Sequence, residues 1–254
     1  MNINNFVIDR IVRAVGKSSD DELLFVINQV TNASLNVTSE TAEAVDALGT
    51  PIAIFNRAKT CEFSAENALF DLNLMAVQAG EDGDGNGSKV TADIVAPAFD
   101  EVKEGKLHHT PVGEVKFYTL NGDDSLGESI AVSADGGEDG GIVLEGTTIT
   151  KGMPEGVRVM AVYEYNADNA IAVINSAKKF PKACELVLEV LGCDVCKQDE
   201  LIYAYLIFPN FKISPDFDWS IATDGAHPFS GRAMQDYCDA EKILYKLVIV
   251  GDED

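Results

Sequence analysis

One acidic, glycine-rich segment could bind calcium. In DGDGNGSKVTAD, Asp82, Asp84 and Asn86 alternate with glycines, and Asp93 stands at the twelfth position. Alternating oxygen ligands, a central glycine and an acidic twelfth residue are features of the EF-hand calcium loop. However, Lys89 stands at position eight, where an apolar residue should be, and VTADIVAP follows where a helix should begin. An Asp/Gly turn without an ion is the alternative, and we expect no cofactor elsewhere.

Cysteine spacing could indicate zinc or redox chemistry. Cys193 and Cys196 form a CxxC motif, with Cys184 nearby. Zinc needs four ligands, and there is no second CxxC or suitably spaced histidine pair, so Cys61 and Cys238 could join only through the fold. A redox CxxC opens a helix in a βαβ unit, which this sequence does not provide. We therefore expect free thiols in a turn and in the core.

Other signals of catalysis are weak. His108 and His109 are consecutive, so in a strand they would point in different directions, and HHTP is better interpreted as a solvated strand entry fixed by Pro111. The third histidine, His227, stands alone. The chain has no GxSxG, HExxH, phosphate-loop or GxGxxG motif, and its carboxylates are typical of solvated acidic loops. The sequence therefore predicts that the protein is not an enzyme.

The elements that must position these residues are mostly β-strands. In the segment Val157 to Tyr165, every second residue from Val157 onward shares one face, and Cys184 to Leu191 repeats this period of two. Further strands rich in β-branched and aromatic residues are expected at Leu23–Ile27, Ile52–Phe55, Thr60–Phe63, Val115–Leu120, Ile171–Ile174, Leu201–Phe208, Phe217–Ile221 and Ile243–Val250. The first fifteen residues could be helix or strand. This pattern predicts a mainly β protein with an antiparallel β-sandwich or barrel.

One principal helix is expected at about 64–79. Ser64 could cap it, Gly80 could end it, and an apolar stripe of Leu69, Leu72, Ala76 and Ala79 should pack on the sheet. The section after it is loop-rich and acidic, with turns at Gly80–Gly87, Asn121–Glu128 and Ala134–Gly141. We expect a single domain over residues 1–254. This domain could contain an inserted lobe at about 81–156.

Composition limits the classes of function. The 254 residues include 46% hydrophobic residues, enough for a substantial core. The formal charge of -23 makes binding to nucleic-acid phosphates improbable. No apolar run is long enough to cross a bilayer, the N-terminus is not a signal peptide, and five cysteines indicate a reducing compartment. We expect a soluble protein made in the cytoplasm, without a membrane anchor.

Two segments resemble the major tail tube proteins of tailed bacteriophages and related contractile injection systems. They are DALGTPIAIFNRAKTCEFSAENALFDLNLMAVQAG from Asp46 to Gly80, and FPNFKISPDFDWSIATDGAHPFSGRAMQDYC from Phe208 to Cys238 with the final ILYKLVIV. The match is one of pattern over roughly the first third and last quarter of the chain. The resemblance implies a β-sandwich or barrel with one helix, hexameric rings stacked into a tube, and an acidic lumen through which DNA is ejected without specific binding.

Two classes of function remain. In the first, the chain is a structural subunit of a virion tail tube, assembled in the host cytoplasm through contacts with itself and with other tail proteins. In the second, it is a β-sandwich binding or virion-decoration module, for which Asp82 to Asp93 could supply a stabilising calcium site. The absence of catalytic motifs, the acidic charge and the resemblance favour the first class.

Overall fold

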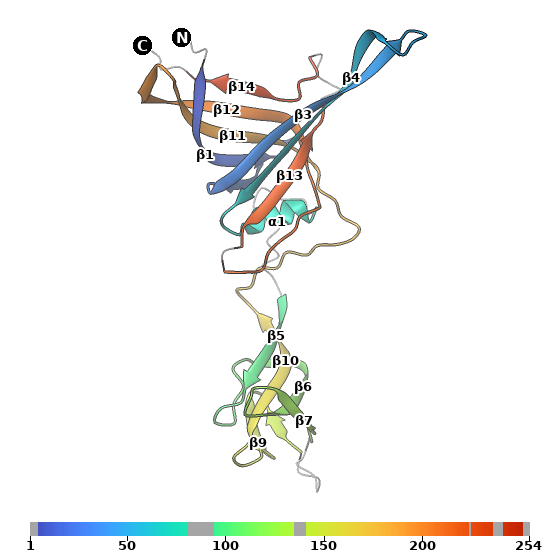
Figure 1. The fold of residues 1–254 in the computed structure, drawn as a ribbon. Helices are drawn as coiled ribbons and strands as arrows, with labels where there is room; N and C mark the ends of the chain where they lie inside the picture. The colour runs from blue at the N-terminus through green and yellow to red at the C-terminus, as the bar shows by residue number, and fades with distance from the viewer. Residues whose placement is uncertain (1–4, 81–93, 135–140, 224, 236–240, 251–254) are drawn as a thin grey trace. The chain divides into compact units, whose positions relative to one another are not determined.

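The structure is a computed structural model that describes residues 5–80, 94–134, 141–223, 225–235 and 241–250. The chain divides into two compact units: a first unit of residues 1–89 and 173–254, and a second unit of residues 90–172 (Figure 1). The second unit therefore lies within the sequence of the first. Among the described residues, no helix is both long and apolar enough to cross a membrane.

The first unit is built on one antiparallel sheet. Its strands follow the spatial order β2 (Leu23–Ile27), β1 (Phe6–Lys17), β11 (Ala183–Asp194), β12 (Lys197–Ile213), β13 (His227–Ala233), β4 (Pro51–Asn67) and β3 (Val30–Val45), and β14 (Lys246–Ile249) also pairs with β12. β2 and β3 stand at opposite ends of this order, yet only Asn28 and Gln29 separate them in sequence. The sheet therefore curls until its edges meet at this point, as in a partly open barrel. This confirms the prediction of a mainly β, antiparallel fold.

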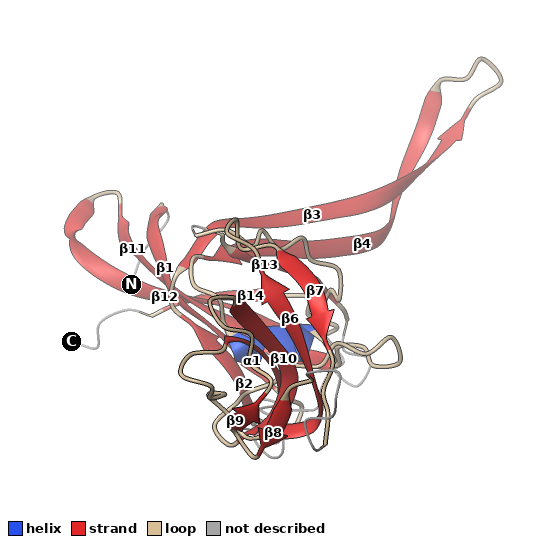
Figure 2. Cartoon of the chain, turned by 90° about the horizontal axis from the view of Figure 1, so that it is seen from below, coloured by secondary structure: helices blue, strands red, loops and turns tan. Residues whose placement is uncertain are grey.

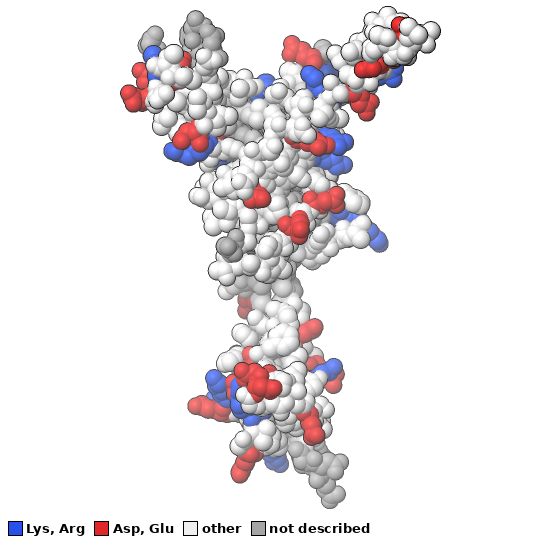
Figure 3. Space-filling model, in the orientation of Figure 1, with Lys and Arg blue, Asp and Glu red and all other residues white. Residues whose placement is uncertain are grey.

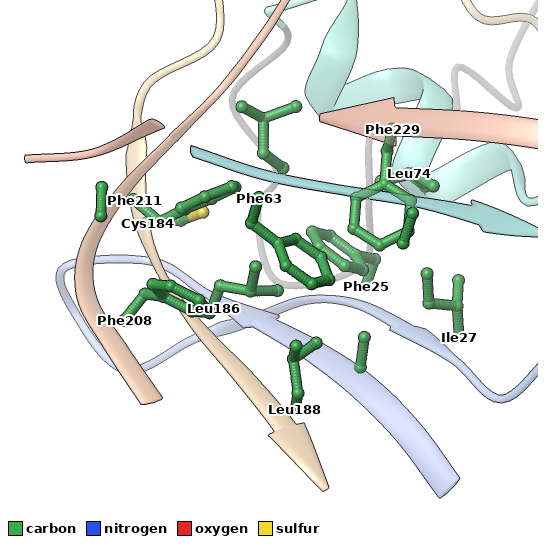
Figure 4. Close-up of a cluster of buried hydrophobic side chains, with 14 of the residues drawn as sticks. Phe25, Ile27, Phe63, Leu74, Cys184, Leu186, Leu188, Phe208, Phe211 and Phe229 are labelled. Atoms are coloured by element: carbon green, nitrogen blue, oxygen red, sulfur yellow. The ribbon is translucent and has the colours of Figure 1, made fainter. Parts of the chain in front are cut away.

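Aromatic and aliphatic side chains from one face of the sheet form the core of the first unit. Phe63 on β4 lies 5.8 Å from Phe208 and 5.9 Å from Phe229, measured between ring centroids (Figure 4). Leu186 and Leu188 on β11 are fully buried in the same cluster, which also includes Cys184 and Val190 from the same face of the strand. The predicted inward face of Cys184 to Leu191 is therefore confirmed.

The predicted helix exists, but it begins later than expected. Helix α1 spans Leu72–Gln78, and the side chain of Asp71, not Ser64, caps it by accepting a hydrogen bond from the Leu74 N–H at 2.7 Å. Ser64 instead lies in β4, which pairs with both β3 and β13 as far as Asn67. The alternating burial of Phe63, Ala65 and Asn67 outweighs the helical spacing.

The buried face of α1 agrees with the predicted stripe in part. Ala76 and Ala79 are buried as predicted, but Leu69 and Leu72 are exposed. Leu74 and Val77 are buried in the core instead. The later start of the helix explains the change, since it leaves Leu69 outside the helix. The chain then leaves the helix through Gly80, whose φ of +78° is the left-handed conformation expected after a C-cap.

Two segments predicted as strands are not strands. Ile171–Ile174 and Phe217–Ile221 form no regular ladder. In the second segment, Trp219 stacks on Phe70 with ring centroids 4.5 Å apart, so its apolar residues serve packing rather than sheet pairing. Within the first fifteen residues, which the sequence leaves open, Phe6 to Val15 belong to β1.

The second unit has its own sheets and its own core. Its strands are β5 (Ile94–Glu101), β6 (Pro111–Leu120), β7 (Leu126–Ile130), β8 (Val143–Glu145), β9 (Thr148–Lys151) and β10 (Arg158–Ala167), arranged in the order β5-β10-β6-β7 with β8-β9 as a separate hairpin. Val159, Ala161 and Tyr163 on β10 are buried in this core, as the alternation predicts. Ile94 pairs with Ala167, so the chain enters and leaves the unit on neighbouring strands.

Candidate assembly interface

The residues with predicted metal chemistry do not form a site in the part of the chain that the structure describes. The calcium-loop residues Asp82, Asp84, Asn86 and Asp93 lie outside the described residues. Within the described ranges, no group of three or more His, Cys, Asp or Glu side chains could hold a metal ion. The calcium loop stays a prediction.

The cysteines are spread over the first unit. Cys61 and Cys184 are buried thiols of the core, and burial raises the pKa of Cys184 to about 12, so it stays protonated. Cys193 lies next to the last residue of β11, and Cys196 is exposed in the turn before β12. Cys238 lies outside the described residues. The four described cysteines are free thiols, and a protonated, buried Cys184 is inert as a nucleophile.

His108 and His109 belong to a hydrogen-bonded corner of the second unit. The His108 ring Nδ1 lies 3.1 Å from Asp100 Oδ1, and the backbone N–H of His109 donates to the Tyr163 hydroxyl at 3.0 Å. The Tyr163 hydroxyl in turn donates to Asp100. Burial alone would raise the pKa of Asp100, but the hydrogen bonds from Tyr163 and His108 hold it below its usual value. These contacts fix the entry to β6, which begins at Pro111 as predicted.

His227 has a structural role in the first unit. It is fully buried: its Nδ1 accepts a hydrogen bond from the Asp71 N–H at 3.3 Å, and its Nε2 lies 2.8 Å from Gln78 Oε1. The Gln78 amide nitrogen donates to the Pro228 carbonyl at 3.1 Å, so Oε1 accepts and His227 Nε2 carries the proton. The ring is therefore neutral, and it ties β13 to both ends of α1. Burial lowers its pKa, against the opposite effect of the Asp71 carboxylate.

A hollow of about 660 Å³ on the sheet of the first unit is lined by serines but contains no serine–histidine pair. Its lining includes serines from several segments, Ser34, Ser64, Ser214 and Ser230. A serine nucleophile needs a neighbouring base, and the lining contains no histidine. Arg232, which also lines it, is ion-paired with Glu62.

A two-stranded arm, defined here as residues 41–56 of β3, β4 and their connecting turn, extends away from the first unit (Figures 1 and 2). Within it, Thr41 to Ala44 pair with Asn56 to Ala53, and the turn is held by Asp46 Oδ1, which accepts from the N–H groups of Leu48 and Thr50 at 2.8 Å each. No other described strand pairs with this part of β3 and β4. The arm is therefore supported by its own ladder alone.

The arm exposes large apolar side chains on both of its faces. The exposed fractions are 91% for Leu48, 70% for Ile52, 61% for Ile54 and 58% for Phe55. An isolated two-stranded hairpin is only marginally stable in water. Large apolar residues exposed together on such an element mark an interaction site. The arm has the properties of an element that is completed by another molecule.

The first unit also has long sheet edges that lack proline. β2 pairs with β1 only from Ala14 to Lys17, so Phe6 to Arg13 have a described partner strand on one side only, β11. β3 pairs with β4 alone. Neither β1 nor β3 contains a proline. Long edges without proline leave rows of unpaired backbone groups that can pair with another chain.

The edge strands of the second unit are interrupted by a proline or are short. β5, at one end of its sheet, carries Pro97, which lacks the N–H group needed for pairing. β7, at the other end, has only five residues. Short strands and prolines are the usual protection against edge-to-edge association. The long free edges of β1 and β3 therefore offer more backbone for pairing with another chain than the edges of the second unit do.

The arm and edges are the features expected of a self-assembling subunit, and comparison with known proteins agrees. The sequence profile of the YomU/Tube protein family matches residues 6–245. The chain belongs to this family. No curated protein matches the sequence. Membership in the YomU/Tube family makes this a tube-type structural protein and implies a structural, non-enzymatic role.

Part of this interface was predictable from the sequence. The pattern predicts strands at Ile52–Phe55 and Thr60–Phe63, but it predicts neither β3 nor the continuous β4. In β3 nearly every residue is exposed, so no single apolar face produces a clear period of two. The available signal was the β-branched residues of Val30 to Val45, followed by a DALG turn and a second β-rich run.

Proposed function

We propose that this protein is a structural subunit of a bacteriophage tail tube, which self-assembles into stacked hexameric rings around an acidic channel for DNA ejection. The observation that carries the proposal is the arm at residues 41–56, an apolar two-stranded element without a partner strand among the described residues. Family membership supports it independently. Other tail proteins are its further partners, and the virion tail is its location.

The sheet edges support assembly in rings. The β1 edge and the β3 edge are different surfaces, so contacts that join one kind of edge to the other are head-to-tail. Head-to-tail contacts produce closed rings when the rotation between copies closes. A closed ring uses every such edge and removes the risk of uncontrolled pairing. Hexameric symmetry follows the resemblance to tail tube proteins.

Electron microscopy of the purified chain tests the proposal. We expect rings or tubes from the wild-type protein at micromolar concentration. A variant in which residues 41–56 are replaced by an Asn-Gly turn should keep its β-rich circular dichroism spectrum and sediment as a monomer. Lys116→Ala, an exposed change in the second unit, is the matched control and should assemble normally. A wild-type chain that stays monomeric, even when offered a preformed tail assembly, would contradict the proposal.

A further inference from the structure

A β-bulge in β4 determines which residues share a face of the arm. Ser39 pairs with Lys59 and Thr41 pairs with Asn56, so Arg57 and Ala58 on β4 together oppose the single residue Glu40 on β3. An extra residue of this kind reverses which alternate residues of a strand face which side. Odd-numbered residues of β4 such as Cys61 and Phe63 face the core, whereas beyond the bulge Phe55 faces the opposite way.

The bulge therefore gives the arm two unlike faces. Directly paired residues of an antiparallel ladder lie on the same face, so Phe55 shares its face with Ala42, and Ala53 with Ala44. Within residues 41–56, this Phe55 face has one large aromatic ring among small alanines, and Glu40, two residues before Ala42 on β3, borders it at the bulge. The opposite face contains Glu43 paired with Ile54, and Thr41 paired with Asn56.

The net charge of the chain limits which face of the arm can form a contact with a second copy. Each copy carries a formal charge of -23, so copies repel one another, and a contact surface between them must avoid buried carboxylates. From Ala42 to the turn, the Phe55 face meets this condition, with Glu40 only at its border, whereas covering the opposite face of the arm would bury Glu43 in its middle. Small alanines also allow another sheet to approach closely around the aromatic ring.

We infer that Phe55 is the anchor residue of the arm, and that the Phe55 face docks on a second copy of this chain. The inference rests on the proposed function and adds to it the face and the residue that make the contact. A few residues, often large aromatic side chains packed at the centre of a contact, carry most of the affinity of an interface.

Two matched pairs of variants test the inference in the full-length chain. Phe55→Ala should raise the protein concentration needed for tube formation at least about tenfold, whereas Ile54→Ala on the opposite face should change it less than about twofold. Ala44→Glu places a carboxylate on the Phe55 face and should prevent assembly, while Thr41→Glu places the same group on the opposite face and should be tolerated. Circular dichroism of each variant checks that the sheet is retained.

A fluorescence measurement tests the same inference if the alanine or glutamate variants fold poorly. Phe55→Trp in a Trp219→Phe background should shift its emission to shorter wavelength on assembly, because the ring becomes buried, and Ile54→Trp should not. Wild-type tubes together with equal effects of Phe55→Ala and Ile54→Ala, or an emission shift at position 54 alone, would overturn the inference and leave the proposed function standing. A wild-type chain that forms no tubes would overturn the proposed function itself.

Discussion

At the residue scale, His227 makes the first unit sensitive to acid. Its two ring nitrogens accept from the Asp71 N–H and donate to Gln78, an arrangement that only the neutral ring allows. Protonation would remove the acceptor at Nδ1. The surrounding rings of Phe70 and Phe217 carry no charge that would compensate, and the opposing effect of the Asp71 carboxylate is smaller than that of burial.

We predict that the free energy of unfolding of the first unit decreases as pH falls below about 6.5. The pKa of His227 is lowered in the folded protein, so the unfolded chain takes up a proton at a higher pH than the folded chain does, and acid favours unfolding. Fluorescence of Trp219, the single tryptophan, during urea titration at pH 7.5 and 5.5 measures this in the monomeric arm-replacement variant.

The control for this prediction is a variant without the titrating ring. His227→Gln should lose about 1–3 kcal/mol at pH 7.5, because it disrupts buried hydrogen bonds, and should depend less on pH. His109→Gln, an exposed position in the second unit, should leave the pH dependence of the Trp219 transition unchanged. A wild-type stability that is equal at both pH values would contradict this role of His227.

At the element scale, α1 stabilises the first unit through a face that its sequence does not reveal. Leu74 is fully buried in the main core, whereas Leu72 is 36% exposed. The N-cap at Asp71 sets this rotation by fixing where the helix begins. A helix of seven residues has little stability by itself, so its packing must hold it in place.

We therefore predict unequal effects of two leucine substitutions in α1. Leu74→Ala should cost about 2–5 kcal/mol, because it removes a buried side chain and leaves a cavity. Leu72→Ala should cost less than about 1 kcal/mol. Urea unfolding followed by Trp219 fluorescence compares them, and an equal or reversed order would show that the helix packs through the other face.

At the scale of the whole molecule, we propose that the second unit is a lobe inserted into a single tube-forming domain. Its first and last strands begin and end side by side, with Ile94 paired to Ala167, so a short linker could join the two ends. Its core residues form a cluster separate from that of the first unit.

Deletion of the lobe should leave the first unit folded. Replacing residues 94–167 by a short Gly/Ser linker is expected to change the unfolding free energy reported by Trp219 by less than about 1 kcal/mol, and to leave tube formation intact. A linker variant that is insoluble, while the same linker inserted after Asn121 in the intact chain is tolerated, would show that the first unit depends on the second.

The acidic composition leads to a prediction about the channel. A genome that passes many rings would stall if each subunit attracted it even weakly, so the bore should repel phosphate. Screening extends only about 8 Å at 0.15 M salt, so the carboxylates must lie close to the passing DNA. Figure 3 shows acidic and basic side chains interspersed on the drawn face of both units. The charge distribution on this face of a single chain therefore does not identify which surface lines the channel. An electrostatic map of the assembled ring should show a negative bore, and a neutral or positive one would exclude this mechanism.

The sequence by itself determined the chemistry that this chain lacks and the class of its fold. Missing catalytic motifs, the formal charge of -23 and the period of two in Cys184 to Leu191 and Val157 to Tyr165 depend on residue type and local spacing alone. Such local patterns suffice because alternation directly produces a half-buried strand. The mainly β fold with one helix was therefore predictable.

Only the tertiary structure decided where strands end, which faces are buried and what remains without a partner. Ser64 to Asn67 became strand because β3 and β13 flank them, although their spacing also suits a helix. The outward position of Phe55 depends on a bulge that shows no motif in the sequence. Strand ends and buried faces depend on pairing between segments that are far apart in the sequence. The residues of one segment do not specify which strand pairs with it, because that depends on the whole fold.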